Sequence, residues 1–204
     1  MRPLALALLS ALYLFTLDAA EIENRVFAAI PSKLNPMIVV SFVWKSGKGL
    51  PDYREMAKNN DNDPLTIWSK MQVAMDNGDM AALSACYNAE SKNDISMKIK
   101  SGDFRNKAEE RRGLNIEISG TALMEDFSFV AYVLNSPKYG KFPWVNIVTG
   151  PSPWLIDSTV PINSSLNMAV VSWSYAEHNS DLLINLPKDG FNYGTLGIRT
   201  GLSQ

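Results

Sequence analysis

The chain has 204 residues, of which 46% are hydrophobic and 20% are charged, and its formal net charge is −2. This composition is typical of a globular protein, and the small net charge argues against binding to nucleic acid or to an anionic membrane. The single cysteine excludes an intrachain disulfide, and the single histidine excludes a metal site built from several histidines. We therefore expect one domain held by its core, with no cofactor, no metal and no nucleic-acid partner.

The first residues have the pattern of a secretory signal. A positively charged start precedes an apolar run from Leu4 to Leu17, which is shorter than the roughly 20 residues of a membrane-spanning helix. Ala19 and Ala20 follow as small residues at candidate cleavage sites. We expect a signal peptide over residues 1–20, export to the periplasm or the extracellular space, and a mature single domain over 21–204 without a stable membrane span.

The mature part opens with a predicted strand and a polar connection. Residues 37–44, "MIVVSFVW", are rich in β-branched and aromatic side chains, which predicts a buried strand. The "SGKG" at 46–49 lacks the GxxxxGK[ST] spacing of a phosphate-binding loop, so it predicts a plain turn. The polar stretch 45–62 follows, with a short helix expected near 53–58.

Two helices are predicted to meet with almost nothing between them. Asp63 and Pro64 are typical of a helix start, and Gly78 is typical of a helix end. Asp79 can cap a second helix at once. Apolar residues recur at helical spacing in both segments and predict one shared core: Ile67, Trp68, Met71, Ala74, Met75, Met80, Leu83, Cys86 and Tyr87. In this stretch the thiol of Cys86 is expected to be a buried packing group.

The stretch at 94–103 fits either a strand or a helical turn. A polar helix is predicted from Asp103 to Arg112, and the pattern then changes to strands. Alternating apolar residues predict strands over 114–119, 126–134, 143–149, 153–160, 166–176 and 181–187. Helices followed by such a run predict an α+β fold, with N-terminal helices packed on a curved, mainly antiparallel sheet. The glycine-rich tail after 187 is expected to form an edge strand or a loop across the sheet.

The order of these elements resembles the NTF2-like superfamily, which has a cone-shaped, cystatin-like α+β fold. Gly78-Asp79 stand where a small residue and an acid separate the first two helices of that family, and Trp154-Leu155-Ile156 match a late strand that begins with tryptophan. The resemblance covers residues 64–160. It implies a pocket between the helices and the sheet, and we expect its ligand-binding residues to be Trp68, Met71, Tyr87, Phe129 and Trp154. The family includes isomerases, dehydratases and non-catalytic binding modules, so the fold alone does not fix the function.

Three residues are candidates for catalysis in such a pocket. Asp157 lies between apolar neighbours in "WLIDST", Tyr87 can donate a hydrogen bond, and His178 is the only imidazole. Burial of one of these groups would move its pKa toward the working pH. Each of them also has a purely structural interpretation: Asp157 as a solvated carboxylate, Tyr87 as a packed core residue and His178 as a surface histidine.

Three functions remain open from the sequence. The first is an exported, non-enzymatic module that binds a small apolar ligand or an envelope protein. The second is a pocket enzyme of isomerase or dehydratase type. The third is a structural subunit of an envelope assembly, which pairs with a neighbour through the strand at 37–44 or through the tail.

Overall fold

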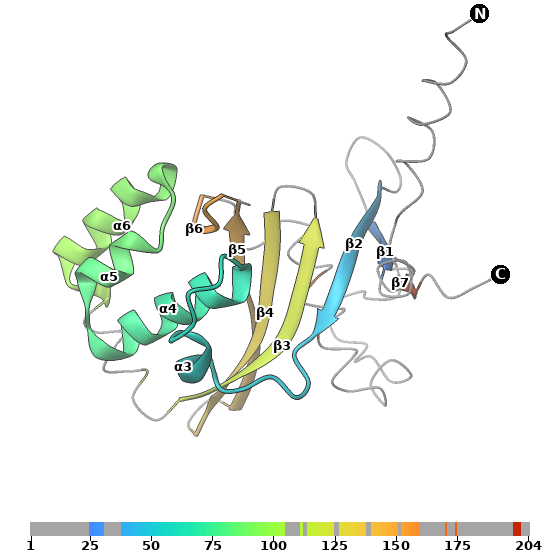
Figure 1. Ribbon diagram of the computed structural model, residues 1–204, viewed down its shortest axis with the longest axis horizontal. Coiled ribbons are helices and arrows are strands. Elements are labelled where there is room, and N and C mark those ends of the chain that lie inside the picture. The colour runs from blue at the N-terminus through green and yellow to red at the C-terminus, as the bar shows by residue number, and fades with distance from the viewer. Residues whose placement is uncertain are drawn as a thin grey trace, which may run out of the picture.

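The computed structural model describes residues 25–30, 38–104, 111, 114–124, 127–137, 140–150, 152–159, 170, 174 and 198–200 (Figure 1). Its helices are α3 (Tyr53–Met56), α4 (Pro64–Asn77), α5 (Met80–Ala85) and α6 (Ala89–Ser101). Its strands are β1 (Arg25–Ile30), β2 (Ile38–Ser46), β3 (Asn115–Met124), β4 (Phe127–Ser136), β5 (Gly140–Thr149), β6 (Leu155–Asp157) and β7 (Ile198–Thr200).

The strands form one curved sheet that is not closed, and α3 to α6 lie on one side of it (Figure 1). The order is β6-β5-β4-β3-β2-β1-β7, and every neighbouring pair is antiparallel. The predicted α+β class with helices on a curved antiparallel sheet is therefore confirmed. The helices are not N-terminal, however, because β1 and β2 precede them in the chain.

The tight helix pair is confirmed in detail. The Asp63 side chain accepts from the N–H groups of Leu65 and Thr66, and Gly78 ends α4 in the left-handed conformation at φ 66°. Asp79 then accepts from the N–H of Ala82 and caps α5. Glycine adopts a positive φ without the steric penalty of a Cβ, so two residues suffice to stop one helix and start the next.

The ambiguous stretch at 94–103 is mostly helix α6. Ile95 is buried while Met97 is 64% exposed, so a helical rather than an alternating face meets the core. Gly102 ends α6 at φ 83°. Of the polar helix predicted beyond it, the structure describes Asp103, Phe104 and Arg111, and all three are helical.

Most predicted strands are present, and the strand predicted over 166–176 is wrong at the two residues that the structure describes. The segments at 37–44, 114–119, 126–134, 143–149 and 153–160 correspond to β2, β3, β4, β5 and β6. In the strand predicted over 166–176 the structure describes Val170 and Ser174, and both are helical and buried. The segment 181–187 lies outside the described residues, and β7 in the tail is an edge strand beside β1.

Strands β3, β4 and β5 contribute buried residues on both faces of the sheet. The helix-side core contains Trp68, Met71, Leu83, Tyr87, Ile95, Ile118, Val130, Tyr132 and Ile156, among others. The opposite-face core contains Phe42, Trp44, Ala122, Phe129, Ala131, Val145, Ile147 and Val170. Alternate residues of β4 therefore enter different cores, which is the period-two geometry of a strand.

β2 lies inside the sheet and not at its edge. β1 pairs with it from Ile38 to Val43, and β3 pairs with it from Val43 to Ser46. Within the described residues only Val43 therefore has a strand partner on both sides, because Ile38 to Phe42 pair with β1 alone and Trp44 to Ser46 pair with β3 alone. Pairing of this strand with the sheet of a neighbouring molecule therefore stays a prediction.

Candidate functional site

An open groove lies where the chain leaves β2. The ladder between β2 and β3 ends at the pair Ser46–Gly120, whereas β3 stays paired with β4 as far as Asn115. The chain after Ser46 turns away toward α3 and leaves a groove of about 590 Å³. One wall is the segment from Ser46 to Tyr53, and the other is the start of β3 from Asn115 to Ile118. We call these the loop wall and the strand wall.

Gly47 fixes the point where the two walls separate. Its N–H donates to the carbonyl of Ser119 at 2.7 Å. A Cβ on Gly47 would lie 2.3 Å from the carbonyl oxygen of Ile118, so no side chain fits there without a backbone shift. The N–H of Leu50 then donates to the carbonyl of Gly47 at 3.1 Å and closes the turn. The plain turn predicted for "SGKG" is confirmed.

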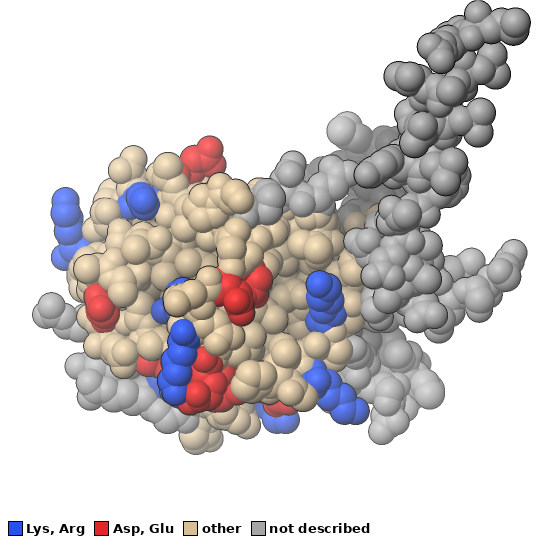
Figure 2. Space-filling model, viewed as in Figure 1, with Lys and Arg blue, Asp and Glu red and all other residues tan. Residues whose placement is uncertain are grey.

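The groove offers both apolar and charged contacts. Leu50 is 38% exposed, which makes it one of the few large apolar side chains at the described surface. Lys48, Asp52 and Glu117 are also exposed along the two walls. Figure 2 shows Lys, Arg, Asp and Glu scattered over the drawn face rather than gathered into a patch of one sign. A partner with an apolar side chain and charges of both signs would match this lining.

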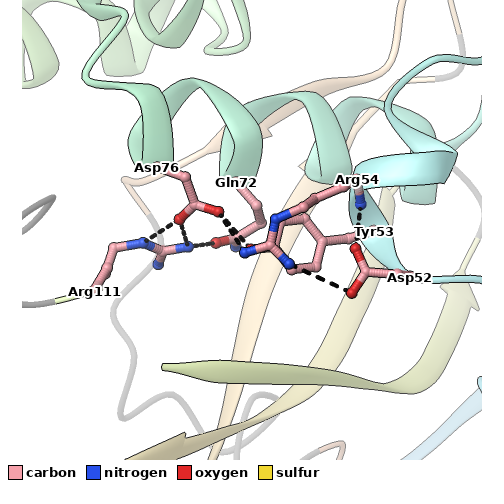
Figure 3. Close-up of polar contacts among 6 residues, drawn as sticks. All are labelled: Asp52, Tyr53, Arg54, Gln72, Asp76 and Arg111. Carbon is pink, nitrogen blue, oxygen red and sulfur yellow. Dashed lines mark hydrogen bonds and ion pairs between the residues drawn. The ribbon is translucent and has the colours of Figure 1, made fainter. Parts of the chain in front are cut away.

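A polar cluster lies behind the loop wall and centres on the carboxylate of Asp76, at the end of α4 (Figure 3). The Tyr53 hydroxyl donates to Oδ2 at 2.5 Å, and the Arg54 guanidinium donates to the same oxygen at 3.2 Å. Nε and Nη2 of Arg111 each lie 3.3 Å from Oδ1. Both carboxylate oxygens are therefore used, and three donor residues from two segments converge on one acceptor.

Gln72 extends this cluster into the core. Nη2 of Arg111 donates to its Oε1 at 2.5 Å, and Gln72 itself is fully buried. Its Nε2 donor has no hydrogen-bond partner within the described part of the chain. The Arg111 side chain is only 11% exposed, so its two partners hold it in place under partial desolvation.

The structure brings together four of the five residues predicted to bind a ligand. Trp68, Met71, Tyr87 and Trp154 all lie in the helix-side core and are at most 8% exposed. The Tyr87 hydroxyl donates to Sδ of Met71 at 3.4 Å, and the Trp68 ring packs 4.9 Å from that of Tyr132. These side chains fill the space between helices and sheet, and none of them lines the groove.

Phe129 stands apart from the other four. It belongs to the opposite-face core, where its ring meets that of Phe127 at 5.6 Å. The sheet therefore separates Phe129 from Trp68 and its neighbours. A single pocket lined by all five residues would have to pass through β4.

The catalytic candidates have structural partners where the structure describes them. The Asp157 carboxylate accepts from the N–H and the hydroxyl of Thr159, at 2.8 and 2.7 Å, and so stabilises its own loop. Burial raises the pKa of the Tyr87 hydroxyl to about 12, so it stays protonated at neutral pH. His178 lies outside the described residues.

Two further groups are held protonated by their surroundings. Burial raises the pKa of the Cys86 thiol to about 11, and its Sγ donates to the Ala82 carbonyl at 3.3 Å. Burial, followed by the hydrogen bond to Asp76, raises the pKa of Tyr53. The prediction of a buried packing cysteine at position 86 is confirmed, and a thiol with a raised pKa is a poor nucleophile.

Sequence reasoning missed the groove and the Asp76 cluster. The groove depends on where a strand ladder ends, and the cluster joins residues 22 to 35 positions apart in the chain. One signal was available: an exposed Leu50 beside Pro51 interrupts an otherwise polar connection.

Within the described ranges, no helix is long and apolar enough to cross a membrane, and no cluster of His, Cys, Asp or Glu could hold a metal ion. Comparisons of the chain with family models, with curated proteins and with solved structures give no match. The resemblance to the NTF2-like superfamily therefore stays a prediction.

Proposed function

We propose that this protein is an exported, non-enzymatic binding module of the cell envelope, and that its groove holds a segment of a partner polypeptide. The observation that carries the proposal is the open groove between the loop wall and the strand wall. Export is supported by the apolar run and the small residues at the start of the sequence.

The lining of the groove favours a polypeptide over a small apolar ligand. Small-molecule sites are mostly apolar and enclose most of the ligand surface. This groove is open, and exposed Lys48, Asp52 and Glu117 lie along it beside the apolar Leu50. Trp68, Tyr87 and Trp154, which were predicted to bind an apolar ligand, are buried in the helix-side core, and Phe129 is buried in the opposite-face core. Polypeptide segments carry apolar and charged side chains in succession, which suits the mixed lining.

The resolved pKa shifts support binding rather than acid–base catalysis. A catalytic acid or base works best with a pKa near the operating pH. The pKa values of Tyr53, Tyr87, Tyr132 and Cys86 all move upward, away from neutrality, because burial disfavours their charged forms. The isomerase or dehydratase alternative would need another group, and Asp157 and His178 are the remaining candidates.

Native mass spectrometry of the protein purified from its own envelope tests the proposal. We expect the wild-type protein to retain a polypeptide of defined mass. Leu50→Asp places a charge at the groove and should abolish that complex. Met97→Asp is the matched control, because Met97 is another exposed apolar residue but lies on α6, outside the groove lining.

Two results would overturn the proposal. A small-molecule adduct that disappears in Leu50→Asp would make the groove a ligand site. A polypeptide complex that survives in Leu50→Asp would place the interface on another surface.

A further inference from the structure

One carboxylate connects the two walls of the groove. Tyr53 and Arg54 stand at the end of the loop wall, and both donate to Oδ2 of Asp76. Arg111 stands just before the strand wall and donates to Oδ1 of the same side chain. Figure 3 shows Arg111 and Arg54 approaching Asp76 from opposite sides.

The connection from Arg111 to the strand wall is short and bonded. The carbonyl of Arg111 accepts from the N–H of Leu114 at 2.9 Å, and β3 begins at the next residue. We therefore expect a displacement of Arg111 to reach Asn115 through this hydrogen bond. The connection on the other side is shorter still, because Tyr53 itself lines the groove.

The charges in the cluster favour a single arrangement. Two guanidinium groups would repel each other unless an anion lies between them, and Asp76 provides that anion. The Arg111 and Asp76 side chains are only 11% and 21% exposed, so water screens their contact less than it screens a surface pair. Since α4 packs on the sheet through fully buried Trp68, Asp76 stands on a rigid support.

We propose that Asp76 is the positioning residue of the groove, and that it fixes the distance between the loop wall and the strand wall for the partner segment. Its consequence for binding rests on the proposed function. The geometric part does not, because it can be measured in the free protein. Asp76 contacts no groove ligand itself; it acts through Tyr53, Arg54 and Arg111.

The first test is hydrogen exchange of the full-length free protein. Asp76→Asn keeps the shape of the side chain and removes its charge. We expect exchange to become about tenfold faster both in α3 and at the start of β3, as expected when charge-assisted hydrogen bonds are lost. Arg54→Ala should speed exchange in α3 alone, because Arg111 keeps its partner. This variant also guards against a folding failure of Asp76→Asn, since Arg54 is 56% exposed.

The second test measures the distance across the groove. Spin labels on Lys48→Cys and Asn115→Cys, in a Cys86→Ala background, report the separation of the walls. We expect a broader distance distribution in Asp76→Asn than in the wild-type protein. Glu55→Gln is the matched control: it also removes a paired carboxylate, but its partner Lys58 is an exposed residue just after α3, outside the cluster. That variant should leave the distribution unchanged.

The outcomes separate this inference from the proposed function. Unchanged exchange or an unchanged distance distribution in Asp76→Asn overturns the inference, whatever the partner does. If the walls loosen but the variant still retains the polypeptide found on the wild-type protein, positioning is not needed and the inference also fails. Leu50→Asp decides the proposed function by itself, because Leu50 takes no part in the Asp76 cluster.

Discussion

The helix-side core and the groove contrast in what they are made of. The core gathers the tryptophan, tyrosine and methionine side chains that suggest a ligand pocket in the sequence, and it packs them against one another. The groove is built from a short polar connection and the start of a strand, with a single exposed leucine. The difference teaches that a concentration of aromatic residues marked the packed interior here, whereas open space arose where two strands stopped pairing.

The largest expected effect on stability comes from a substitution in the helix-side core. Trp68 is fully buried, and its Nε1 donates to Asn146 at 3.0 Å. We expect Trp68→Ala to lower the free energy of unfolding by about 3–5 kcal/mol, because it leaves a cavity and an unpaired amide oxygen. Urea denaturation measures this. Trp144→Ala is the control, since Trp144 is 38% exposed, and its cost should stay below about 1 kcal/mol.

A second prediction concerns the loss of stability at alkaline pH that comes from the Cys86 thiol in the same core. The folded state holds the pKa of Cys86 at about 11, compared with its ordinary value of 9.0. Between these values the unfolded chain binds fewer protons than the folded one, so stability is full below pH 9 and falls as pH rises toward 11. The loss from this group is on the order of 2 kcal/mol.

Cys86→Ser isolates the thiol in that experiment, since serine can still donate to the Ala82 carbonyl but does not titrate in this range. Stability measured from pH 8 to 10 should fall less steeply in Cys86→Ser than in the wild-type protein. Equal slopes would show that the thiol does not contribute. Tyr87, whose pKa is raised from 10.0 to about 12, adds a similar loss only at higher pH.

A third prediction moves to the groove. Gly47→Ala forces a Cβ against the backbone of Ile118 and should cost about 1–3 kcal/mol, with a displaced loop wall. Gly49→Ala meets no atom within 4 Å and carries only the strain of its φ of 84°, about 1 kcal/mol. Thermal denaturation of the pair distinguishes the two costs. A Gly47→Ala variant as stable as the wild-type protein would contradict the close packing described here.

The smallest expected effect on stability comes from a substitution in the groove, and it distinguishes the groove from the core most clearly. Leu50→Asp should change the free energy of unfolding by less than about 0.5 kcal/mol, because the side chain lies at the surface. Denaturation of Leu50→Asp and of Met97→Asp should give matching midpoints. A large loss in Leu50→Asp alone would mean that Leu50 supports the fold, and its effect on partner binding would then need another explanation.

Local signals predicted much of the fold. The caps of α4 and α5 depend on residues next to each helix end, so Asp63, Gly78 and Asp79 could be read directly from the sequence. Alternation located most strands for the same reason. It also showed which residues of β4 share a face, but not which face the helices cover. For that reason Phe129 was grouped with Trp68 although the sheet lies between them.

The candidate site was beyond the reach of these signals. Asp76 near a helix end has the pattern of a solvated residue, and its donors Tyr53, Arg54 and Arg111 are distant in the chain. The packing of α3 on α4 brings Tyr53 and Arg54 to Asp76, and Arg111 reaches it from the chain before β3. The groove has no sequence motif either. It forms where β2 and β3 stop pairing, and the end of backbone pairing does not require particular residue types.

The outer edge of β6 carries a consequence for self-association. Edge strands with free backbone groups can template pairing between copies of a protein. Ile156 in the middle of β6 directs its N–H to the carbonyl of Cys86 at 2.8 Å and accepts from the N–H of Asn88 at 3.0 Å. The link between α5 and α6 therefore saturates the outward hydrogen bonds of Ile156, and this end of the sheet is closed to fibre-like stacking at the high protein concentration of a crowded compartment.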